Sequence, residues 1–278
     1  MKNILVPCDF SAPSREAFKF AINIAAKTKG EIVVLYAIQI PVMYDFGGGT
    51  PLAVNPISLA SMEEDAKKLF QKMNHELQAN TVKTSLEILQ LDLISAIKRL
   101  IDTKKTDIVV MGTAGTSGFQ EMLIGSNTEK VVRHSPVPVL AVRTAPALDS
   151  IKRILLPTTL KLDQTAFIGK VKELQEFFNA SLQILLVNTP SHFMPDAEAN
   201  EALAEFVKYY KLKNYTLHFR NYRNEEDGIV KFAHEEKSDL IAMATHARKG
   251  LAHIFNGSIT EDVVNHLTCP VWTYSRGK

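Results

Sequence analysis

The chain has 278 residues, of which 46% are hydrophobic and 22% charged, a composition typical of a soluble globular protein and not of a disordered one. Its 32 basic and 30 acidic residues leave a net charge of +2, which gives no reason to expect binding to nucleic acid or to an anionic membrane. The longest apolar run, residues 32–38, is far shorter than the roughly 20 residues that span a bilayer, and the chain starts with a strand-like segment rather than a signal peptide, so we expect a cytoplasmic protein.

In the first half, apolar β-branched runs alternate with segments of helical period, which predicts βαβ units around a parallel sheet. Strands are expected at residues 2–7, 31–37, 84–89, 107–111 and 137–143. Helices are expected at residues 13–28, 59–79, 92–103 and 126–134. The glycines at 47–49 lie between prolines and not at a strand-to-helix junction, so we interpret them as part of a long flexible loop.

A glycine-bearing loop follows the fourth expected strand. Gly112, Gly115 and Gly125 are separated by two and nine residues, and Ser126 comes next, at the start of an expected helix. Glycine permits a positive φ and brings bare N–H groups close to a ligand, and a helix N-terminus favours an anion. The pattern therefore indicates a phosphate site. Ser126 and Glu129 also fit a capping box, so helix capping alone is the alternative explanation for the serine.

The second half of the chain repeats the first. Three of its segments match earlier ones: 152–159 matches 2–9, 239–246 matches 107–114, and 256–264 matches 124–132. Strands are expected at residues 152–157, 181–187, 215–220, 239–243 and 271–275. Helices are expected at residues 163–178, 196–210, 227–236 and 258–267. The polar segment 144–150 contains a proline and separates the copies, so we expect one domain at 1–145 and another at 150–278.

Three blocks of the first half resemble the universal stress protein family. They are the strand and acidic turn at 4–11, the glycine loop with its G-x2-G-x9-G-S spacing, and the segment 131–142 that follows. The resemblance implies an α/β fold with two doubly wound, five-stranded parallel-sheet domains in tandem, similar to the adenine nucleotide alpha hydrolases. In this family the last strands of the domains pair, which would place Trp272 at the interface; a plain core position is the alternative.

The resemblance also implies a site for ATP or another adenine nucleotide, with or without Mg²⁺. It assigns Asp9 to the ribose or adenine end of the nucleotide, and Pro7 and Ala37 to the wall of the base pocket. Many members carry valine where Ala37 stands, so a looser wall is expected here. It assigns the loop and the following helix to the phosphates, through Met111, Gly112, Thr113, Gly115, Gly125, Ser126 and Asn127.

The second half departs from this pattern at its most important positions. Ala244 and Ala247 replace the first two glycines of the loop, and Thr159 stands where Asp9 stood. A methyl group blocks close approach of a phosphate, and an alanine held at positive φ costs on the order of 1–2 kcal/mol. We therefore expect the second half to keep the fold and to have a weakened or lost nucleotide site.

The cysteines and histidines give no strong sign of further chemistry. Cys8 and Cys269 do not form a CxxC pair, so we interpret both as small buried hydrophobic residues, with a reactive or redox-active thiol as the alternative. The histidines show neither zinc-finger nor HExxH spacing, which favours surface or capping roles. If the chain binds zinc, His246 and His253 are the first candidates.

The resemblance and the motifs together predict a stress-response regulatory protein that binds its nucleotide in the first domain, with slow or no hydrolysis. We expect no dedicated enzyme, because the glycine-rich lysine motif of P-loop NTPases is absent from the sequence. An adenylating ligase of related architecture would carry a Ser-Gly-Gly-x-Asp-Ser loop where residues 8–14 read CDFSAPS. The main alternative is a nucleotide-free scaffold for an unknown protein partner, a small apolar ligand or a metal. Internal pairing of the domains favours a monomer, or a homodimer through another surface.

Overall fold

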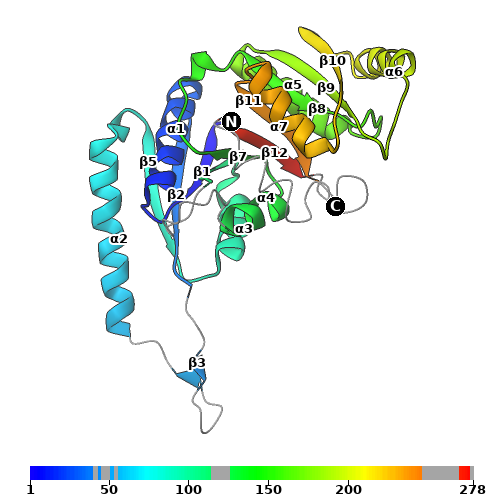
Figure 1. The fold of residues 1–278 in the computed structure, drawn as a ribbon. Coiled ribbons are helices and arrows are strands. Elements are labelled where there is room, and N and C mark those ends of the chain that lie inside the picture. Colours follow the sequence, from blue (N-terminus) through cyan, green and yellow to red (C-terminus); the bar gives the residue numbers. More distant parts are fainter. Residues whose placement is uncertain (40–42, 45–50, 53–55, 114–125, 246–268, 276–278) are drawn as a thin grey trace.

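The computed structural model of the protein describes residues 1–39, 43–44, 51–52, 56–113, 126–245 and 269–275 (Figure 1). Several predictions lie outside the described residues: those for Gly115, Gly125, Ala247, His246, His253, the glycines at 47–49, and the helix at 258–267. The side chain of Ser126 also lies outside the description, although its backbone is included.

Ten strands form one sheet in the order β10-β9-β8-β11-β12-β7-β6-β1-β2-β5 (Figure 1). The strands of the first half are β1 (Asn3–Pro7), β2 (Glu31–Ala37), β5 (Lys83–Leu89), β6 (Ile108–Gly112) and β7 (Val139–Val142). Those of the second half are β8 (Arg153–Pro157), β9 (Ser181–Asn188), β10 (Tyr215–Asn221), β11 (Leu240–Thr245) and β12 (Val271–Ser275). Neighbouring strands within each half are parallel. The predicted fold class is therefore confirmed.

The two halves join through one antiparallel pair of strands, β7 and β12. Val271 lies opposite Ala141, and Trp272 lies opposite Leu140. Trp272 is 2% exposed, and its ring centroid is 6.1 Å from that of Phe167 on the first helix of the second half. The tryptophan is thus both an interface residue and a core aromatic, so the two interpretations offered for it are compatible.

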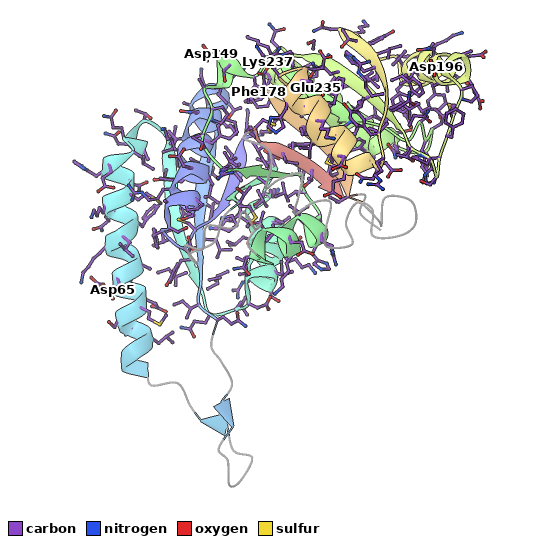
Figure 2. All side chains as sticks on the ribbon, viewed as in Figure 1. Asp65, Asp149, Phe178, Asp196, Glu235 and Lys237 are labelled. Carbon is purple, nitrogen blue, oxygen red and sulfur yellow. The ribbon has the colours of Figure 1, made fainter. Side chains whose placement is uncertain are left out.

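Helices cover both faces of the sheet, as its nearly all-apolar strands predict. In the first half they are α1 (Ala12–Thr28), α2 (Pro56–Glu76), α3 (Leu93–Lys104) and α4 (Ser126–His134), with a 3₁₀ turn, η1, at Ala79–Thr81. In the second half they are α5 (Thr165–Phe178), α6 (Asp196–Tyr209) and α7 (Glu225–Glu235), preceded by the 3₁₀ turn η2 at Leu148–Ser150. Figure 2 shows side chains packed along these helices, with Asp65 on α2 and Asp196 on α6 at opposite ends of the molecule.

Alternate residues of the strands point to opposite faces and enter different cores. Ile4 and Val6 pack on the face that carries α1, whereas Leu5 packs against α3 and α4 on the other face. The core under α1 continues without interruption beneath α5 and α6 of the second half. On the α1 side, Lys27 Nζ donates to the carbonyl oxygen of Phe177 at 2.5 Å and lies 4.5 Å from the centre of its ring. On this face of the sheet the two halves therefore share one continuous core, whereas on the other face each half has its own.

The connection between β2 and α2 differs from the prediction of irregular structure. Met43–Tyr44 (β3) and Pro51–Leu52 (β4) pair as a small antiparallel sheet separate from the main one. α2 begins at Pro56, three residues before the predicted start at 59. Proline is well suited to the first position of a helix because that position needs no N–H donor. Among the described helices, none contains a stretch long and apolar enough to cross a membrane.

Candidate nucleotide site

The strand order brings β1 beside β6, where the chain reverses its direction of progress along the sheet. Ile4 lies opposite Ile108 and Leu5 opposite Val109 in this parallel pair. β2 flanks β1 on its other side. In open parallel sheets, ligands bind beyond the carboxyl ends of the strands at such a switch point. Pro7, Asp9, Ala37, Gly112 and Thr113 all lie at or just beyond these ends, so the predicted residues share one edge of the sheet.

The turn after β1 presents the side chain of Asp9 on the surface. Its Oδ1 accepts hydrogen bonds from the backbone N–H of Ser11 at 3.0 Å and from the Ser11 hydroxyl at 2.5 Å. Phe10 adopts a left-handed conformation with φ 62°, which is rare for a residue with a side chain. Its ring packs 5.6 Å from that of Tyr36, the residue before Ala37. The carboxylate is therefore exposed but locally held in place.

Cys8 helps to form the same turn from inside the protein. Its Sγ accepts a hydrogen bond from the N–H of Phe10 at 3.4 Å, and its thiol donates to Ser14 Oγ at 3.3 Å. Burial raises the pKa of the Cys8 thiol, and the hydrogen bond with Ser14 offsets this only in part. Burial likewise raises the pKa of Cys269 to about 12. Both thiols are free; Cys8 is buried as predicted, whereas Cys269 is only half-buried, so the prediction of a buried residue is confirmed for Cys8 alone.

Gly112 ends β6, and its lack of a side chain has a different reason from the one predicted. Its φ lies outside the left-handed region, so conformational freedom is not what this position requires. A Cβ here would lie 2.5 Å from the carbonyl carbon and oxygen of Pro13 in the first turn of α1. Glycine is needed because the start of α1 packs directly on the end of the strand. The next residue, Thr113, is buried, and its N–H donates to the carbonyl oxygen of Val142 at 3.1 Å.

Helix α4 begins at Ser126, as the glycine-serine pair predicts. Its first turn is anchored by buried Thr128, whose Oγ1 donates to the carbonyl oxygen of Gly112 at 2.9 Å. Glu129 in the same turn forms an ion pair with Arg133 at 3.0 Å, which partly offsets an acidic charge that would otherwise oppose phosphate. Asn127 is exposed beside it. Whether Ser126 caps the helix, binds phosphate or does both stays a prediction.

The remaining predicted residues, Pro7, Ala37 and Met111, lie at or next to the carboxyl ends of their strands. Pro7 is buried as the last residue of β1, and Ala37 is half-buried as the last residue of β2. Met111 is 5% exposed, and its side chain belongs to the core under α3 and α4. Sequence reasoning missed Thr128, although the same threonine recurs at position 260 in the second copy and could have drawn attention to it. It also missed the roles of Ser11 and Pro13.

The second half reproduces the backbone of the β1 turn but not its polar groups. The N–H of Thr158 donates to the carbonyl oxygen of Leu185 at 2.9 Å, as the N–H of Cys8 does to that of Leu35. Leu160 has φ 60°, matching Phe10. Thr158 Oγ1 accepts from the N–H of Leu160 at 2.9 Å. Thr159 and Lys161 stand where the first half has an aspartate and a serine.

Ala244 stands at the position equivalent to Gly112, and α5, the counterpart of α1, begins later after its strand than α1 does. α5 begins at Thr165, whereas the residue equivalent to the start of α1 is 162. Ala244 is buried within the core shared by both halves. Thr245 follows it, and its buried hydroxyl has no hydrogen-bond partner in the described part of the chain. Among the described residues, no group of three histidine, cysteine or acidic side chains is placed to hold a metal.

A model of the Universal stress protein family matches residues 1–143 and again residues 150–275. A universal stress protein of Synechocystis sp. is 27% identical over 306 residues, covering 99% of this chain and all of that protein. One of Methanocaldococcus jannaschii is 32% identical over 144 residues, which cover 51% of this chain and 82% of its own length.

A crystal structure of a universal stress protein from Archaeoglobus fulgidus has a TM-score of 0.75 and 20% identity, with 99% of each chain covered. At this identity the likeness concerns the fold alone, and it extends over both halves and their arrangement. Since the family model matches both halves in turn, the chain belongs to the universal stress protein family and carries two of its domains in tandem.

Proposed function

We propose that residues 1–145 bind ATP or a related adenine nucleotide at the carboxyl edge of β1, β2 and β6, and that its occupancy regulates the protein. The observation that carries this proposal is the direct β1–β6 pairing. It places the Asp9 turn and the end of β6 side by side, and Thr128 ties the start of α4 to that end. The groups proposed to bind the sugar and the phosphates would thus come from three neighbouring elements: the turn after β1, the end of β6 and the start of α4.

The chemistry of the edge suits binding better than catalysis. The Asp9 carboxylate can accept hydrogen bonds from hydroxyl or amino groups, and the N-terminus of α4 favours phosphate through its free N–H groups. Any Mg²⁺ would be held mainly by the phosphates, because Asp9 belongs at the nucleoside end. Efficient hydrolysis also needs a group that orients the attacking water. Asp9 is too far along the nucleotide for this role, so we propose slow or no turnover.

We further propose that residues 150–278 lack this nucleotide site. Thr159 and Lys161 replace the aspartate and serine of the turn, and Ala244 places a methyl group where the first half has none. The same backbone therefore carries a different set of groups. The second half would contribute the shared core and a surface for a partner protein, and the nucleotide would act from the first half alone.

The test is to measure the nucleotide content and the binding of added nucleotide. Protein purified and then denatured should release about one adenine nucleotide per chain, or the purified protein should take up about one ATP in calorimetry with Mg²⁺. The Asp9→Ala/Gly115→Val variant should lose this binding, and Thr159→Ala, changed at the matched position of the second half, should keep it. Two nucleotides per chain would contradict the assignment of a single site. No binding under any condition would leave the nucleotide-free scaffold as the better description.

A further inference from the structure

The hydroxyl of Ser11 is used in an unusual way for its position. Ser11 is the N-cap residue of α1, where a serine hydroxyl ordinarily accepts a hydrogen bond from an N–H of the first helical turn. Here it makes no such capping bond. It donates instead to Oδ1 of Asp9 at 2.5 Å, a length typical of a strong bond to a charged acceptor. The same hydroxyl lies 3.4 Å from Ser14 Oγ in the first turn of α1, so its much shorter bond is the one to the Asp9 carboxylate.

The two hydrogen bonds that Ser11 donates to Asp9 reach the same oxygen of the carboxylate. The backbone N–H at 3.0 Å and the hydroxyl at 2.5 Å both bond Oδ1. In the described part of the chain, no group bonds Oδ2 of Asp9. Since the side chain of Asp9 is exposed, this second oxygen is fixed in orientation and available to a ligand. A carboxylate only accepts hydrogen bonds, so the matching ligand group must be a donor.

The second half shows that this pair is not required to form the turn. Phe10 and Leu160 adopt the same left-handed conformation, with φ 62° and 60°. In each half the N–H of this residue donates to the side chain two residues earlier, which is Cys8 in the first half and Thr158 in the second. The second half forms its turn with Thr159 and Lys161 on either side of Leu160, where the first half has the aspartate and the serine. The Asp9–Ser11 pair is thus an addition to a turn that already holds its shape.

We propose that Ser11 is a positioning residue, which orients the Asp9 carboxylate so that Oδ2 accepts from the ribose hydroxyls of the bound nucleotide. This inference rests on the proposed function of the first half. It predicts that the protein distinguishes ribose from sugars without the hydroxyls, and that this discrimination depends on Ser11 as well as on Asp9. The ligand class is accordingly a nucleotide whose sugar carries free hydroxyls, as opposed to a 2′,3′-dideoxynucleotide.

The experiment compares the affinity of ATP and of 2′,3′-dideoxy-ATP in the full chain by calorimetry. Ser11→Ala should weaken ATP binding about tenfold, the loss expected for one hydrogen bond to a charged group. It should change dideoxy-ATP binding by less than about twofold, because the bond it supports is missing there. Ser11→Thr, which keeps the hydroxyl, should restore ATP affinity. Adding Ser11→Ala to Asp9→Asn should cause little further loss, since the two residues act as one unit.

Each contrary outcome is separable from failure of the proposed function. If the unchanged protein binds no ATP, the function fails before Ser11 is tested. If it binds ATP and Ser11→Ala weakens both nucleotides equally, the serine has no specific role towards the sugar. An equal loss accompanied by a lower urea midpoint would identify Ser11 as a capping residue instead. If the loss disappears with inosine triphosphate rather than with dideoxy-ATP, the carboxylate faces the base, and the ribose assignment is wrong.

Discussion

Replacing Gly112 with alanine tests the close packing of α1 on the end of β6. The added Cβ would lie 2.5 Å from the carbonyl carbon and oxygen of Pro13 and 2.8 Å from its Cβ, all shorter than real contacts of this kind. Two of the three atoms are backbone, so no side-chain rotation relieves the overlap and the first turn of α1 must move. Overpacking of this sort typically costs about 1–3 kcal/mol. Because two of the overlaps are with backbone, we expect the upper part of that range.

Urea unfolding followed by far-UV circular dichroism would measure this loss, and a thermal scan should show a lower midpoint, by roughly 2–4 °C per kcal/mol. Gly169→Ala is the matched control, since nothing lies within 4 Å of a Cβ at that site in α5. The control should stabilise the protein by about 0.5–1 kcal/mol through helix propensity. If Gly112→Ala were neutral or stabilising like the control, the steric argument for this glycine would be refuted.

Three further predictions concern acid stability, the thiols and the junction between the halves. Burial raises the pKa of Asp107, but the N–H groups of Asn3 and Lys2 outweigh it, so the pKa is lower than usual. Its stabilising contribution should be present above about pH 4 and disappear as the pH falls through the lowered pKa. The free energy of unfolding in urea should therefore differ less between pH 3 and pH 7 in Asp107→Asn than in the unchanged protein. Because Cys8 is buried and its pKa is raised, it should react with a thiol reagent at pH 8 only after unfolding, and its fast reaction in the native protein would contradict this; half-buried Cys269, with its pKa raised to about 12, should react slowly. Trp272→Ala should cost about 3–5 kcal/mol, measured by denaturant unfolding, and a change below 1 kcal/mol would argue against the shared core.

The strands were predictable from sequence because their local pattern and their structural role agree. Every predicted strand is present within two residues of its expected ends. A buried parallel strand is a short, continuous apolar run, and here the short lengths and the many β-branched residues distinguish these runs from buried helix segments. The predicted start of α7 was two residues late, although Asn224 caps it and three acidic residues occupy its first turn.

The reason for Gly112 could not be found in the sequence, because the atoms that exclude a side chain belong to Pro13, far away along the chain. The glycine spacing indicates a loop shaped for a ligand, which stays a prediction, and at this position the structure shows a packing requirement that the spacing does not reveal. Ser11 is a similar case. A serine before a helix predicts a cap, and only the coordinates show its hydroxyl turned towards Asp9. Side-chain direction depends on neighbours that a local pattern does not contain.

The antiparallel pairing of β7 with β12 within one chain has a consequence for how the sequence can evolve. In a homodimer of two identical chains joined by these strands, the carboxyl edges of the two sheets would be identical, and every mutation would alter both. When both copies lie in one chain, a mutation alters one edge and leaves the other untouched. Asp9 and Thr159 occupy equivalent turns, in which Phe10 and Leu160 share the same left-handed conformation, yet their side-chain chemistry differs. Covalent duplication thus frees one half to acquire a new role while the other retains the original.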